Sequence, residues 1–113
     1  ITVEKNRSQK YLVDELSLLF NHIKILVIID VENNDLDNAY MLVWRVVNNI
    51  DSNRDIYIDG QTVSIDATNK NGHDHFQRRW PDDVVCTKSI IEDLQSRKII
   101  DIDESFINKW GLI

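Results

Sequence analysis

Two acidic residues, Asp30 and Asp66, each follow a short apolar run and are candidates for acid–base chemistry. Ile23–Ile29 precedes Asp30, and Thr62–Ile65 precedes Asp66. In open α/β sheets, ligands gather outside the carboxyl ends of the strands, where a pair of carboxylates can transfer protons. Acids at strand ends also cap turns and following helices. We favour this structural role for both residues.

A second group of candidates is basic. Lys70, Arg78 and Arg79 lie close in sequence to Trp80 and can bind a carboxylate of a substrate or of a partner subunit. They can equally pair with acids of the same stretch, which are Asp66, Asp74, Asp82 and Asp83. Since Trp beside Arg is typical of interface anchors, we expect the cluster to fix a loop or to form an interface.

Two further motifs suggest metal and thiol chemistry. His73 and His75 flank Asp74, but a zinc site needs a third and a fourth ligand, and the chain has no cysteine pair. We interpret these histidines as solvated loop residues. Cys86 precedes a predicted helix, a position that can activate a thiol, but we interpret it as a small apolar side chain after Val84-Val85.

Composition narrows the class of protein. The net charge is −6, and no basic patch of the kind that drives nucleic-acid binding is present. No apolar run approaches the roughly 20 residues that span a bilayer. The glycines are isolated, so no phosphate-binding loop is predicted, and there is no nucleophile elbow. A single cysteine cannot form an internal disulfide and indicates a reducing cytoplasm.

Hydrophobic spacing predicts the elements that must position these residues. Residues 1–7 are polar and are expected to be frayed, and the rest is expected to be one domain, 8–113. The first half has a helix over 8–21, a buried strand over 23–29 and a helix from Asp35 to about 49. The chain begins at Ile1 and not at Met, so we expect it to be a fragment of a longer chain.

The second half is predicted to contain a hairpin, a long loop and two helices. Strands over 55–58 and 62–65 join at Asp59-Gly60, and residues 69–86 form the loop. Ser89 and Glu92 fit a capping box that opens a helix ending near 98, and a helix over 104–110 stops at Gly111. This order of elements predicts an α/β fold, a small central sheet with helices packed on its faces.

The stretch that leaves the second hairpin strand resembles a known family. Asp66-Ala67-Thr68-Asn69-Lys70, followed by Arg79-Trp80-Pro81, is similar to the C-terminal domain of the UbiD family of decarboxylases, where a strand ends in Asp-Ala-Thr-x-Lys. Upstream, Trp44 is followed by Ile50-Asp51-Ser52-Asn53-Arg54-Asp55, close to the family's Asp-Pro-x-Arg-Asp. Ser52 stands where the family usually has Pro. The Asp59-Gly60-Gln61 turn replaces a longer loop, as in bacterial members assigned to menaquinone biosynthesis.

The resemblance implies an activity for a longer parent chain. Members remove the carboxylate of aromatic or α,β-unsaturated acids with prenylated flavin mononucleotide and a divalent metal. The flavin and a Glu-Arg-Glu set belong to the preceding domain, so we expect no catalytic, cofactor-binding or metal-binding residue here, and no activity from this chain alone. The implied substrate is an aromatic acid such as a naphthoate-type quinone precursor.

The C-terminal domain of the family supplies oligomer contacts and, in some members, residues that close over the substrate. The implied partners are the flavin-binding domain of the same chain and further copies in a homo-oligomer. We expect the aromatic residues Phe76, Trp80 and Trp110 to contribute to such contacts. A structural or interface role is expected for the motif residues, which are Asp66, Ala67, Thr68, Lys70, Arg79, Trp80, Pro81, Arg54 and Asp55. The alternative is a non-enzymatic protein-interaction domain that shares the short motif.

Overall fold

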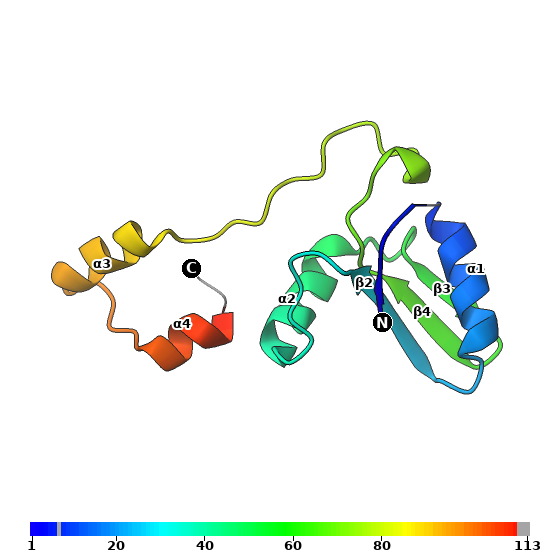
Figure 1. Cartoon of the computed structure of the whole chain (residues 1–113), viewed down its shortest axis with the longest axis horizontal. Coiled ribbons are helices and arrows are strands. Elements are labelled where there is room, and N and C mark those ends of the chain that lie inside the picture. The colour runs from blue at the N-terminus through cyan, green and yellow to red at the C-terminus, as the bar shows by residue number, and fades with distance from the viewer. Residues whose placement is uncertain (7, 111–113) are drawn as a thin grey trace.

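The computed structural model describes residues 1–6 and 8–110. It confirms the α/β class: a mixed four-stranded sheet lies between helices, with the strands in the order β1-β2-β4-β3 (Figure 1). The strands are β1 (Thr2–Val3), β2 (Ile25–Asp30), β3 (Ile56–Asp59) and β4 (Thr62–Asp66). The helices are α1 (Gln9–Leu19), α2 (Ala39–Asn49), the 3₁₀ turn η1 (Gly72–Asp74), α3 (Lys88–Ser96) and α4 (Glu104–Trp110).

The first residues are ordered into the sheet, although the sequence analysis expected them to be frayed. Thr2 and Val3 pair in parallel with Ile29 and Asp30 of β2. The Ile1 ammonium donates a hydrogen bond to the Val27 carbonyl at 2.9 Å. Backbone pairing with β2 therefore fixes this segment, a contact that a short polar stretch does not reveal in sequence. Residue 7 lies outside the described residues.

Helix α1 covers one face of the sheet. Val13 packs with Leu26 and Ile28 of β2 in the core, and the Ser17 hydroxyl is hydrogen-bonded to that of Ser64 at 3.1 Å. Strand β4 pairs in parallel with β2 and antiparallel with β3. The Asp59-Gly60 turn is present as expected, and Gly60 adopts a φ of 58°, which favours glycine.

Two predicted helix starts are wrong. Helix α2 begins at Ala39, because the Asn38 side chain accepts the Met41 N–H, whereas Asp35 closes a small turn by accepting the Asp37 N–H. Helix α3 begins at Lys88 with Thr87 as its N-cap, and no side chain makes the capping hydrogen bond. Ser89 thus lies inside the helix, and the expected capping box with Glu92 is not formed.

The C-terminal part is extended away from the sheet (Figure 1). Residues 81–87 are all exposed and link the sheet to α3. Helix α4 then packs against α2. There the Tyr40 and Trp110 rings lie 5.5 Å apart, and Lys109 Nζ lies 3.8 Å from the Tyr40 centroid. The radius of gyration is 17.0 Å, against about 13 Å for a compact domain of this length. Gly111, the expected end of α4, lies outside the described residues.

Candidate functional site

The strand ends meet at one edge of the sheet and gather charged side chains there. Because β1, β2 and β4 are parallel, their carboxyl ends share this edge, and antiparallel β3 begins at it. Lys5 follows β1, Asp30 ends β2, Asp66 ends β4 and Asp55 precedes β3. The sequence analysis placed Asp30 and Asp66 at strand ends, and the topology adds the other two.

Lys70 is the centre of this group and is fully buried. Its ammonium donates hydrogen bonds to the carbonyls of Thr68 at 2.7 Å and Asp66 at 2.9 Å. It also lies 3.4 Å from Asp66 Oδ1 and 3.8 Å from Asp55 Oδ1. Burial lowers the pKa of Lys70, and the two carboxylates oppose that shift. Lys70 therefore closes the loop after β4 onto the strand that carries Asp66.

Asp66 is buried and shapes the same loop. Its Oδ1 accepts the Thr68 N–H at 2.8 Å and the Thr68 hydroxyl at 2.5 Å. Within residues 1–6 and 8–110, no donor makes a hydrogen bond to Oδ2, which lies 3.7 Å from Lys5 Nζ. This carboxylate holds the chain where it turns away from the sheet and is closed off from solvent.

The second sequence motif joins the first in space. Asp55 is 0% exposed and accepts two hydrogen bonds from the Arg54 guanidinium, each at 2.7 Å, and one from the Asp51 N–H. The hydrogen bond to Asp55 raises the pKa of Arg54. The Asp55 carbonyl accepts the Asp66 N–H at 2.9 Å. Arg54-Asp55 and Asp66-to-Lys70 thus form one buried ionic cluster.

Lys5 completes the cluster from the other side. Its ammonium pairs with Asp74 at 2.7 Å and donates to the Thr68 hydroxyl at 2.7 Å. Asp74 sits in a capping box with Asn71 at the 3₁₀ turn η1. Sequence analysis missed Lys5, since a lone lysine in a polar stretch gives no signal. The parallel pairings of β1 with β2 and of β2 with β4 bring it to Asp66.

Asp30 lies beside the cluster at the wall of a cleft. Its carboxylate accepts the Asn69 N–H at 2.7 Å, and burial raises its pKa. Asn49 of α2 donates to the Ala67 carbonyl at 2.9 Å and to the Asn69 side chain at 3.0 Å. The two predicted strand-end acids thus both bind backbone N–H groups of the loop after β4, the structural role that the sequence analysis favoured.

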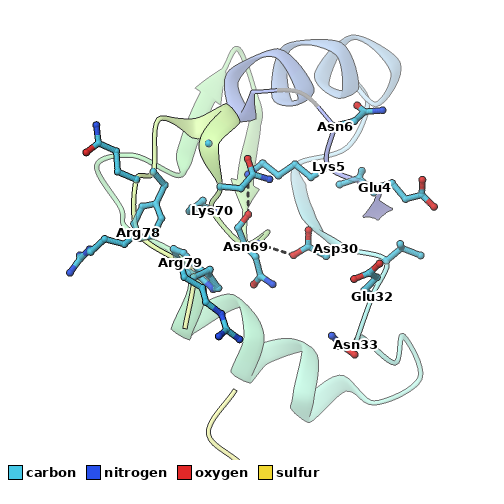
Figure 2. A pocket seen from close by; sticks show the side chains of 17 residues that line it. Glu4, Lys5, Asn6, Asp30, Glu32, Asn33, Asn69, Lys70, Arg78 and Arg79 are labelled. Carbon is cyan, nitrogen blue, oxygen red and sulfur yellow. Dashed lines mark hydrogen bonds between the residues drawn. The ribbon is translucent and has the colours of Figure 1, made fainter. Parts of the chain in front are cut away.

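A cleft of about 710 Å³ opens above this edge (Figure 2). Lys5, Asp30, Asn69 and Lys70 lie on the sheet side, and Arg78 and Arg79 lie across from them. Both arginines are exposed. The cleft therefore has a floor of paired charges, and its lining carries Arg78 and Arg79 together with the acidic residues Glu4 and Glu32.

The Arg79-Trp80-Pro81 motif lies on this rim, outside the buried cluster. Arg79 pairs with Asp82, and both side chains are exposed. Trp80 is half-buried against Phe76, with ring centroids 5.1 Å apart, and the Lys70 ammonium lies 6.0 Å from its ring. The predicted basic cluster is thus divided: Lys70 is internal, whereas the two arginines face solvent.

The remaining candidates lie apart from the cluster. His73 is in η1 and His75 follows it with a left-handed φ of 58°, and both are exposed. Cys86 is exposed on the link to α3. In the part of the chain that the structure describes, no three His, Cys, Asp or Glu side chains are grouped to hold a metal ion.

None of the helices formed by residues 1–6 and 8–110 is long and apolar enough to span a bilayer.

Comparison with known proteins gives relatives without an assigned role. No family model matches the chain. Proteins described as uncharacterized from two strains of Helicobacter pylori are each 38% identical over 113 residues. The match covers 99% of this chain and 18% of each relative, so the chain spans less than a fifth of their length.

Proposed function

We propose that this chain is the C-terminal domain of a UbiD-like decarboxylase, with a role in packing and in covering the substrate. One observation supports the proposal. The two motifs that resemble the family, Arg54-Asp55 and Asp66-to-Lys70, form a single buried unit although ten residues separate them in sequence. Two motifs that form one structural unit are expected if this domain is related to the family.

In this proposal the cluster has a structural part. Lys70, Asp66 and Asp55 contact one another and are closed off from solvent, so none is placed to exchange a proton with a bound acid. In this proposal the catalytic groups, prenylated flavin mononucleotide and a divalent metal belong to the preceding domain of the parent chain. The exposed Arg78 and Arg79 are the groups of this domain that face a carboxylate substrate, such as a naphthoate-type quinone precursor.

The test compares this chain with the longer Helicobacter pylori protein. Both are purified from cells that make prenylated flavin, and flavin absorbance and carbon dioxide release from a set of aromatic acids are measured. We expect cofactor binding and turnover by the longer protein only. Tight flavin binding or turnover by the 113-residue chain would contradict its structural role. A longer protein that neither binds flavin nor releases carbon dioxide would refute the decarboxylase assignment.

A protein-interaction domain is the second candidate function. It is favoured by the half-buried Phe76 and Trp80 pair at the rim of the cleft, with Arg78 5.8 Å from the Phe76 ring. An aromatic pair with a charged border is common in interfaces. The structure leaves both rings partly accessible, so this surface can serve in either function.

A further inference from the structure

Four oxygen atoms surround the ammonium of Lys5 at the edge of the sheet. They are Asp74 Oδ2 and Thr68 Oγ1, each at 2.7 Å, the Asn69 carbonyl at 3.4 Å and Asp66 Oδ2 at 3.7 Å. Carboxylates, a hydroxyl and a carbonyl all accept hydrogen bonds, and a primary ammonium has three N–H groups to donate. We call these four oxygens the cation pocket.

Hydrogen bonds that do not involve Lys5 hold the cation pocket in place. The Thr68 hydroxyl donates its hydrogen to Asp66 Oδ1, so its lone pairs remain for a donor such as the Lys5 ammonium. The Asn71 N–H donates to Asp74 Oδ2 at 3.0 Å, within the capping box of η1. These bonds fix the oxygens independently of the cation between them, as in a preformed binding site.

One oxygen of the cation pocket lacks a hydrogen-bond donor. Asp66 is 1% exposed, and none of residues 1–6 and 8–110 donates a hydrogen bond to its Oδ2. The distance of 3.7 Å to Lys5 Nζ is too long for a hydrogen bond but short enough for attraction between the charges. A buried carboxylate oxygen in this state favours a cation in the pocket over a neutral or anionic group.

Lys5 reaches the cation pocket from a segment with little backbone pairing. Strand β1 has two residues and lies at the edge of the sheet. The Ile29 N–H donates to the Ile1 carbonyl and the Val31 N–H to the Val3 carbonyl, each at 3.0 Å. A strand this short is weakly held by its backbone alone, whereas the Lys5 side chain is only 3% exposed. The ammonium in the pocket therefore contributes much of what fixes the segment.

We propose that the cation pocket is a binding site for a small ammonium cation, which Lys5 occupies from within the chain and thereby fastens the N-terminal strand to the sheet. Lys5 and Asn69 line the cleft, so loss of the Lys5 side chain opens the pocket to solvent (Figure 2). A primary alkylammonium is the ligand that fits, because it brings one positive charge, three N–H donors and an apolar stem. This site does not depend on decarboxylase chemistry.

The first experiment replaces the occupant of the pocket. Lys5→Ala removes the ammonium and most of its stem, and free propylammonium supplies the same atoms. We expect Lys5→Ala to raise the equilibrium constant of unfolding by roughly 100-fold, since it leaves buried carboxylates without their cation. Propylammonium should lower this constant again, about tenfold for each tenfold of concentration above its dissociation constant. Urea denaturation of the 113-residue chain at neutral pH measures both effects.

Two solutes and two chains are the controls. 1-Propanol has the same stem without the charge, and tetramethylammonium has the charge without N–H donors, so neither should stabilise Lys5→Ala. The wild type and Lys10→Ala, which breaks the exposed pair with Asp14, should not respond to propylammonium. If Lys5→Ala is unfolded alone, circular dichroism follows its refolding as propylammonium is added. The proposal is overturned if no concentration stabilises or refolds Lys5→Ala, or if a control solute or a control chain gives an equal effect.

The second experiment tests whether the ammonium fastens the N-terminal strand. Lys5→Met keeps an apolar stem and loses the charge. We expect hydrogen exchange at the Ile29 and Val31 amides to become about tenfold faster or more, relative to the Val63 amide of β4. Unchanged relative rates would refute the fastening role, and so would an equal acceleration in Lys10→Met.

Discussion

Charged residues are usually exposed and aliphatic residues are usually buried, and two regions of the same sheet depart from this pattern. At the carboxyl edge the chain buries Asp55, Asp66 and Lys70, and on the face opposite α1 it exposes Ile25 and Ile58. Lys70 and Asp55 have partners within the chain, whereas Asp66 Oδ2 accepts no hydrogen bond from the described residues. The described residues leave Ile25 and Ile58 largely uncovered. The comparison shows that charges are buried here where ion pairs and hydrogen bonds hold them, whereas these isoleucines are exposed where the sheet is not covered.

The largest effect is expected from breaking the ionic cluster. Asp66→Ala removes the acceptor for the Thr68 N–H and hydroxyl and leaves the ammonium groups of Lys5 and Lys70 with one carboxylate fewer. We expect a loss of about 4 kcal/mol in the free energy of unfolding. This exceeds the roughly 1–3 kcal/mol that one unpaired buried group costs, because two cations are affected. Urea denaturation measures the change.

Asp82→Ala is the control for this prediction. It breaks the Arg79–Asp82 pair, whose side chains are 82% and 78% exposed. An exposed pair contributes about 0–1 kcal/mol. Equal losses in the free energy of unfolding for the two variants would show that burial of the cluster does not increase its contribution to stability.

The next effect compares a buried isoleucine of β2 with an exposed isoleucine of β3. Ile28 is 1% exposed and packs on α1, so Ile28→Ala should lower the free energy of unfolding by about 3 kcal/mol through lost burial and a cavity. Ile58 is 76% exposed, so Ile58→Ala should change it by about 0.5 kcal/mol or less. Thermal unfolding tests both variants, and similar losses would mean that Ile58 is buried in the folded chain.

A smaller effect concerns the link to the C-terminal helices. Arg45 of α2 binds Asp83 through two hydrogen bonds, each at 2.5 Å. Arg45→Lys cannot keep this forked geometry, and we expect the link to lose about 1–2 kcal/mol of local stability. Limited proteolysis should cleave residues 81–87 faster, with little change in the melting temperature. Arg79→Lys, at an exposed pair, should leave the cleavage rate unchanged.

The smallest effect is a pH dependence at Asp30. Burial raises its pKa above the usual 3.8, so its contribution to stability is full at low pH and is lost as pH rises through the folded-state value. Asp30→Asn keeps an acceptor for the Asn69 N–H but does not ionise. Its stability relative to the wild type should therefore increase from about pH 3 to pH 7, as measured by urea denaturation. A constant difference would show that Asp30 does not titrate abnormally.

Much of the fold follows from local pattern. The apolar run before Asp30, the Asp59-Gly60 turn and the spacing of Leu12 and Leu16 predicted β2, the hairpin and α1, because these signals act over a few residues. The start of α2 did not follow from the sequence, since Asp35 and Asn38 are both good caps and only backbone geometry selects Asn38.

The candidate site was only half predictable. The sequence by itself placed Asp66, Lys70 and Asp55 near predicted strand ends. Only the tertiary structure decided that they share one buried cluster, that Lys5 joins it, and that Arg79 stays outside. The physical reason is that strand order and direction bring distant strand ends to one edge. The strand order decides which charged side chains meet and which parts of the sheet stay uncovered, and no local sequence pattern predicts that order.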